Sequence, residues 1–193
     1  MIRRPTSLIA ALLALAAGAC GSGERSSEAT ASEDGAPEPE QGIYGQAPAA
    51  VGGVRSVIML TPGEGTSMPE ESEPSITIDQ FGLTFSPTRI IAQLGQPVAF
   101  TNSESALAHN VRVRAVGDTI DVIDADANPG ERLTVELSAS GGYDVLCDMH
   151  PGMTAFIFVS DASRSVFAES DGAFLLDGVP PGAYNIQLWT AEG

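Results

Sequence analysis

Short runs of apolar and β-branched residues alternate with turn-forming residues between positions 75 and 159. Such runs are typical of β-strands that bury one face, and Gly95-Gln96 and Gly141-Gly142 mark turns between them. No segment after residue 20 carries the repeat of about 3.6 residues that an amphipathic helix needs. We therefore predict strands at Ser75–Ile78, Leu83–Ser86, Ile90–Gln93, Pro97–Asn102, Asn110–Val116, Thr119–Ile123, Arg132–Leu137, Gly142–Leu146 and Thr154–Val159.

Many short strands at this spacing predict an all-β fold, in which residues 75–160 form a Greek-key β-sandwich. Residues 161–193 carry a second β-pattern, with apolar positions alternating on both sides of Pro180-Pro181-Gly182. Two or three strands bury too little surface to be stable alone. They must therefore either pack on the larger sandwich or recruit the apolar run at 51–61 into a small additional β-sandwich, and we expect the second arrangement. The larger sandwich is then inserted between strands of the smaller one, and residues 51–74 supply a strand and a loop.

The first residues of the chain have the features of an export signal. Arg3-Arg4 precedes an apolar stretch at Ser7–Ala17 that is too short to span a bilayer. The following Ala17-Gly18-Ala19-Cys20 resembles the lipobox of bacterial lipoproteins. We predict that residues 1–19 are a lipoprotein signal peptide and that Cys20 carries lipid. The protein is then exported and anchored to the bacterial cell envelope; an ordinary secretory signal cleaved near Ala19 is the alternative.

Charge and composition narrow the choice of partners. Residues 20–50 are rich in Gly, Ser, Glu, Ala and Pro, which predicts a disordered acidic tether. The chain has 25 acidic and 9 basic residues and a formal net charge of −16. This balance argues against nucleic acid and anionic membrane surfaces as partners, because both attract positive patches. Basic proteins and metal cations remain as candidates.

The cysteines and histidines point to one metal site. If Cys20 carries lipid, Cys147 is the only thiol left. The segment from Cys147 to Met153 places a thiolate, the imidazole of His150 and a thioether in a predicted turn. His109, the only other histidine, stands at the start of a predicted strand. Two imidazoles, one thiolate and a weak axial thioether are the ligands of a trigonal blue-copper site.

Ligand type separates copper from zinc. A structural zinc site needs four Cys or His ligands, and only His109, Cys147 and His150 are available. A catalytic zinc site with these three ligands and a water stays open. Met153 favours copper, because thioether suits Cu(I) and is a poor ligand for zinc. Met149 is a competing thioether, but it lies two residues from Cys147 and we expect it to point away. We predict one copper ion per chain.

The segment 85–159 resembles the cupredoxin family, most closely its plastocyanin, pseudoazurin and amicyanin branch. The resemblance is carried by Phe85-Ser86-Pro87, Gly95-Gln96-Pro97-Val98, Phe100-Thr101-Asn102, His109-Asn110-Val111 and Cys147-x-x-His150-x-x-Met153. It implies that His109 is a buried ligand, that Cys147 forms the short thiolate bond, and that Met153 is axial. It also implies a surface electron port at His150, hydrogen bonds from Asn110 that tie the ligand loops together, and a surround formed by Pro151, Gly152 and Leu107.

Residues 161–193 resemble the carboxypeptidase regulatory-like (transthyretin-like) β-domain. Asp171-Gly172-Ala173-Phe174 and Gly178-Val179-Pro180-Pro181-Gly182 carry this resemblance. It implies a role without catalysis.

The predicted function is that of a one-electron carrier and not an enzyme. Two histidines are too few for the additional copper sites of multicopper oxidases and nitrite reductases. The family implies a monomer that exchanges electrons with a redox protein, such as a c-type cytochrome. Two alternatives remain: a copper scavenger or metallochaperone with the same ligands, and a structural β-module with a vestigial metal site.

Overall fold

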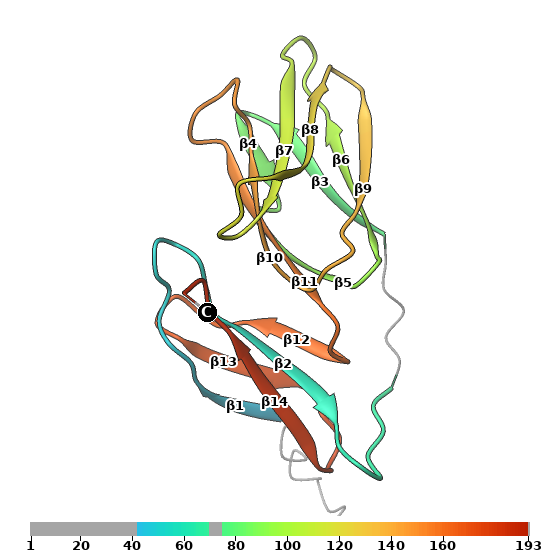
Figure 1. Ribbon diagram of the computed structural model, residues 1–193, viewed down its shortest axis with the longest axis vertical. Coiled ribbons are helices and arrows are strands. Elements are labelled where there is room, and N and C mark those ends of the chain that lie inside the picture. The colour runs from blue at the N-terminus through green and yellow to red at the C-terminus, as the bar shows by residue number, and fades with distance from the viewer. Residues whose placement is uncertain (1–41, 70–74, 193) are drawn as a thin grey trace, which may run out of the picture. The chain divides into compact units, whose positions relative to one another are not determined.

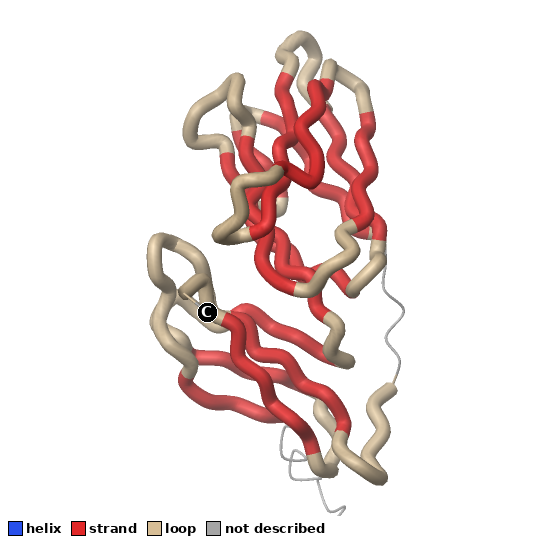
Figure 2. The backbone as a smooth tube through the Cα atoms, in the orientation of Figure 1, coloured by secondary structure: helices blue, strands red, loops and turns tan. Residues whose placement is uncertain are grey.

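The computed structural model describes residues 42–69 and 75–192, and every regular element in these ranges is a β-strand (Figure 1, Figure 2). None of these residues forms a helix of the length and hydropathy needed to span a membrane. The strands are β1 (Gly42–Gln46), β2 (Val57–Pro62), β3 (Ile76–Phe81), β4 (Thr84–Ser86), β5 (Arg89–Gln93), β6 (Pro97–Asn102), β7 (His109–Ala115), β8 (Asp121–Ala127), β9 (Arg132–Glu136), β10 (Gly141–Leu146), β11 (Thr154–Ser160), β12 (Arg164–Phe167), β13 (Ala173–Asp177) and β14 (Tyr184–Trp189).

Strands β3 to β11 form two sheets, with the orders β4-β3-β6-β9 and β5-β11-β10-β7-β8. The pairs β3–β6 and β5–β11 are parallel, and the other neighbours are antiparallel. Alternate residues of each strand face inward, and burying each large apolar side chain contributes about 1.5–3 kcal/mol. The all-β sandwich predicted for residues 75–160 is therefore confirmed. Its fully buried core includes Ile78, Val98, Phe100, Val111, Val113, Val145 and Ile157.

The smaller unit is built from segments that are far apart in the sequence. Its sheets have the orders β12-β2-β14 and β1-β13. Strand β2 pairs with β12 on one side and with β14 on the other. The predicted recruitment of residues from 51–61 is confirmed, although the strand begins at Val57. The larger sandwich is inserted between β2 and β12, as expected.

A further apolar cluster joins β2, β11 and β14. Val57, Phe156 and Phe158 are buried in it, and the Trp189 ring packs against them. The Trp189 ring centroid lies 5.7 Å from that of Phe156 and 5.2 Å from that of Phe158. Gly142 leaves room for the indole, because a Cβ at this position would lie 2.7 Å from it. Strand β11 therefore has apolar side chains packed on both of its faces.

The tether predicted for residues 20–50 is wrong over residues 42–50. Strand β1 pairs with β13 along its whole length, and Gly45 lies opposite Phe174. A Cβ at Gly45 would come within 2.8 Å of the Phe174 ring, so a side chain at this position would displace that ring. Most residues of β1 are exposed, so the strand lacks the apolar run that would predict it from the sequence. Residues 1–41, including the predicted signal peptide and Cys20, lie outside the described residues.

The strand predicted at Thr119–Ile123 is displaced, since β8 covers Asp121–Ala127. The Asp118 carboxylate accepts hydrogen bonds from the backbone N–H groups of Thr119 (2.6 Å) and Ile120 (3.2 Å). This pattern is typical of a turn that an aspartate side chain stabilises. The apolar alternation at 120–123 therefore starts inside a turn, and the strand begins later.

Candidate metal centre

Two neighbouring strands bring the ligand-bearing segments together. His109 is the first residue of β7 and shares the inner face of its strand with Val111 and Val113. Cys147 directly follows β10, after the inward-facing Tyr143 and Val145. Because β7 and β10 are antiparallel neighbours, the start of one and the end of the other lie at the same end of the sheet. His109 and Cys147 are both buried there.

A short hydrogen-bonded loop, residues 147–153, returns His150 to the same place. The N–H of Cys147 donates to the carbonyl of Met153 (3.1 Å), and the N–H of Met153 donates to the carbonyl of His150 (3.1 Å). Gly152 has a φ of +93°, a conformation that glycine adopts without strain. These hydrogen bonds hold the ligand loop in shape.

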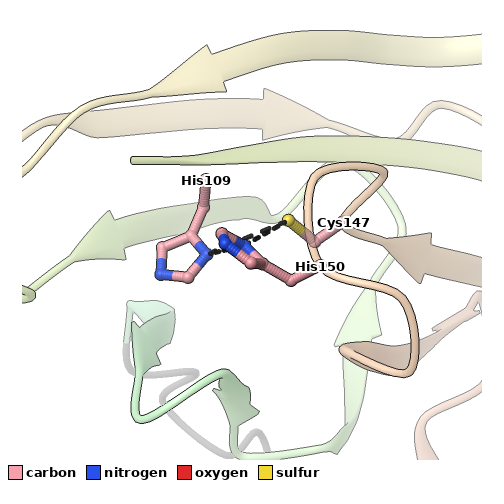
Figure 3. Close-up of side chains that lie close together, drawn as sticks. All are labelled: His109, Cys147 and His150. Carbon is pink, nitrogen blue, oxygen red and sulfur yellow. Dashed lines mark hydrogen bonds between the residues drawn. The ribbon is translucent and has the colours of Figure 1, made fainter. Parts of the chain in front are cut away.

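The three side chains converge on one point, and Figure 3 shows both imidazoles turned toward the sulfur. The Nδ1 atoms of His109 and His150 are 3.0 Å apart. The Cys147 Sγ lies 3.9 Å from Nδ1 of His109 and 3.6 Å from Nδ1 of His150. In the described part of the chain, these residues are the only His, Cys, Asp or Glu cluster arranged to hold a metal ion.

The triangle fits a first-row transition metal. Bonds of about 2.0 Å to nitrogen and about 2.3 Å to sulfur, at angles of about 100–120°, separate the donor atoms by about 3.1–3.7 Å. The observed separations are 3.0, 3.6 and 3.9 Å. Two imidazoles and a thiolate in trigonal array are the donor set of electron-transfer copper sites.

The surroundings of His109 favour the neutral form of its imidazole, which is the form that binds metals. Burial lowers the pKa of His109, the nearby His150 lowers it further, and Glu104 opposes these effects without cancelling them. A lowered pKa favours the neutral imidazole, which is the form that binds metals. The Nε2 atom of His109 is buried and has no hydrogen-bond partner among the described residues, so Nδ1 is the nitrogen that meets Cys147.

Comparison with known proteins agrees with this geometry. Residues 72–160 match the family of copper binding proteins, plastocyanin/azurin family. Residues 75–160 form a cupredoxin domain. The domain has a site for one copper ion per chain.

Solved structures include similar chains. One is a purple cupredoxin from Nitrosopumilus maritimus, with 24% identity and a TM-score of 0.39 over 44% of this chain and 99% of that one. Another is the reduced Cu(I) form of the P52G mutant of amicyanin, with 23% identity and a TM-score of 0.41 over 47% of this chain and 87% of that one. No curated protein is similar enough in sequence to match this chain.

The two candidate methionines of the cupredoxin domain differ sharply in exposure. Met153 is 2% exposed and belongs to the main core, whereas Met149 is 46% exposed. A buried thioether can act as a ligand in a buried metal site, whereas an exposed thioether points into solvent. The exposures favour Met153 over Met149 as the axial ligand.

Asn110 joins strand β7 to the ligand loop. Its Oδ1 accepts hydrogen bonds from the N–H groups of Asp148 (2.7 Å) and Met149 (3.4 Å). Its Nδ2 donates to Oδ1 of Asp124 (3.1 Å). These hydrogen bonds restrain the loop beside Cys147.

The sequence did not single out three further residues near the site. Asn102 donates from Nδ2 to the carbonyls of Leu107 (2.9 Å) and Ala127 (2.7 Å), which holds the loop before His109. Gln80 donates to the carbonyl of Asn110 (3.2 Å). Arg112 forms an ion pair with Asp148. The role of Asn102 could have been predicted from its position at the end of an apolar strand. The contacts of Gln80 and Arg112 could not, because they join distant segments of the chain.

Proposed function

We propose that the cupredoxin domain is a one-electron carrier, with copper held by His109, Cys147 and His150 and more weakly by Met153. The observation that carries the proposal is the triangle of two imidazole nitrogens and one sulfur, with separations of 3.0–3.9 Å. When bound in such a site, copper supplies a Cu(II)/Cu(I) couple. A single ligand cluster among the described residues supports a carrier and not an enzyme that needs several metals.

The protein contributes a frame that stays in place during electron transfer. Hydrogen bonds within the loop join Cys147, His150 and Met153. His109 is fully buried, so water does not reach it. Fixed ligands that suit both oxidation states reduce the rearrangement that accompanies each electron step.

His150 is the proposed electron port. It is partly exposed, whereas His109 and Cys147 are buried. The exposed residues Leu107, Pro151 and Gly152 offer an apolar surround on which a partner protein can pack closely. The net charge of −16 favours a basic redox partner, such as a c-type cytochrome, and disfavours nucleic acid. We propose that the protein meets this partner as a monomer.

The N-terminal features support a place in the cell envelope. A short apolar stretch preceded by Arg3-Arg4 and followed by Cys20 supports export and lipid anchoring. The resemblance of residues 161–193 to the carboxypeptidase regulatory-like domain supports a structural role for that unit.

Voltammetry of the copper-loaded protein tests the carrier function. We expect a reversible one-electron couple, and copper that stays bound in both oxidation states when a chelator is added. The buried His109 and Cys147 and the closed ligand loop oppose release. Copper that leaves rapidly on reduction, with no reversible couple, would instead favour copper handling.

The axial role of Met153 makes a separate prediction. We expect Met153→Leu to raise the reduction potential and keep the visible colour, because the axial ligand tunes the potential while the thiolate bond remains. Met149→Leu is the matched control in the same loop and should leave the potential unchanged, since its side chain is exposed. Equal shifts in both variants would contradict the assignment.

A further inference from the structure

An ion pair connects the strand of His109 to the loop of Cys147. Nη2 of Arg112 lies 2.9 Å from Oδ1 of Asp148. Arg112 is in β7, and Asp148 directly follows Cys147. The pair therefore bridges the two segments that carry the metal ligands His109 and Cys147.

The ion pair places the positive charge of Arg112 next to the residue that follows Cys147. In the sheet, Arg112 lies opposite Leu146, the residue before Cys147. The Arg112 side chain is 25% exposed, and its Nε is buried with no hydrogen-bond partner among the described residues. A charge that is partly withdrawn from water acts on its neighbours more strongly than a fully solvated one. The guanidinium is therefore placed to influence the metal site.

Asp148 brings the opposite charge. Its carboxylate accepts from Arg112 and lies 3.4 Å from Nδ2 of Asn110, which holds the ligand loop. An unbalanced negative charge beside copper stabilises Cu(II), the more positive ion, and an unbalanced positive charge stabilises Cu(I). The pair places both signs beside Cys147 and balances one with the other.

We propose that Arg112 and Asp148 are positioning residues whose opposite charges offset each other, so that neither charge alone shifts the reduction potential of the copper site. This inference rests on the proposed one-electron function. Each charge offsets the effect of the other on the metal, and their contact holds residue 148 against strand β7. The pair acts through its charges and through the position of the ligand loop, and neither residue belongs to the ligand cluster.

Voltammetry on three variants of the full chain tests the proposal. Arg112→Met keeps an apolar stem but leaves Asp148 unbalanced, so the potential should fall. Asp148→Asn keeps the shape of the side chain but leaves Arg112 unbalanced, so the potential should rise. The double variant should lie between the single variants and close to the wild type. All three should keep the visible colour, because no ligand changes.

Arg114→Met is the matched control. Arg114 is on the same strand and pairs with Asp121 at 2.9 Å with similar exposure, but it makes no contact with the ligand loop. The reduction potential of the Arg114→Met protein should equal that of the wild type. Shifts of the same sign in Arg112→Met and Asp148→Asn, or no shift, would overturn the proposal and indicate simple loosening of the loop. A wild-type protein without a reversible couple would overturn the carrier function and this inference with it.

Discussion

We expect Cys147→Ser to abolish the visible absorption of the copper-loaded protein and to weaken copper binding by more than about 100-fold. Cys147 is the one cysteine within the described ranges, and its sulfur forms one corner of the ligand triangle. Loss of a residue that only orients a ligand costs about 10–100-fold in affinity, and loss of the ligand itself should cost more. Serine keeps the size of the side chain but removes the soft thiolate that suits Cu(I). Copper titration followed by visible absorption measures both effects.

Cys20→Ser is the control for this experiment, because it removes the other cysteine of the sequence. We expect it to keep the colour and the affinity, since His109, Cys147 and His150 remain. A Cys147→Ser protein that retained the visible band would show that the sulfur is not a ligand.

We expect Phe158→Ala to lower the free energy of unfolding by about 3–5 kcal/mol, the cost of truncating a well-packed phenylalanine. Phe158 is fully buried and packs against the Trp189 ring. Its neighbours in β11, Ile157 and Val159, belong to the main core. The cavity therefore opens in β11, an interior strand of the five-stranded sheet. Urea unfolding followed by the fluorescence of Trp189, the only tryptophan, measures the loss.

Phe81→Ala is the matched control, because Phe81 is 59% exposed. Its effect should stay within about 0.5 kcal/mol. Phe158→Leu fills most of the space and should cost less than Phe158→Ala. A loss below about 1 kcal/mol for Phe158→Ala would mean that this aromatic contact contributes little to stability.

The candidate site was accessible to sequence analysis because most of its donors are close in the chain. Cys147, His150 and Met153 follow one another in a single loop, and a loop of this length keeps them together wherever it lies. His109 could be added because no other histidine remained. The pairing of β7 with β10 then places it next to Cys147.

The supporting contacts could not be predicted in the same way. Arg112 and Asp148 are 36 positions apart, and each has the polarity of an ordinary surface residue. Their contact depends on the register that sets Arg112 opposite Leu146. A shift of one residue would turn Arg112 to the other face of the sheet.

The sequence by itself determined the all-β class, the turn positions, the ligand loop and the insertion of one β-sandwich into another. These features follow from local periodicity, from turn chemistry and from the need to bury an apolar face. Only the tertiary structure decided which strands pair. It showed that β1 pairs with β13, that β8 begins at Asp121, and that Arg112 forms an ion pair with Asp148, the residue after Cys147. Strand pairing joins segments distant in the chain, and the alternation that marks a buried face does not name the partner that covers it.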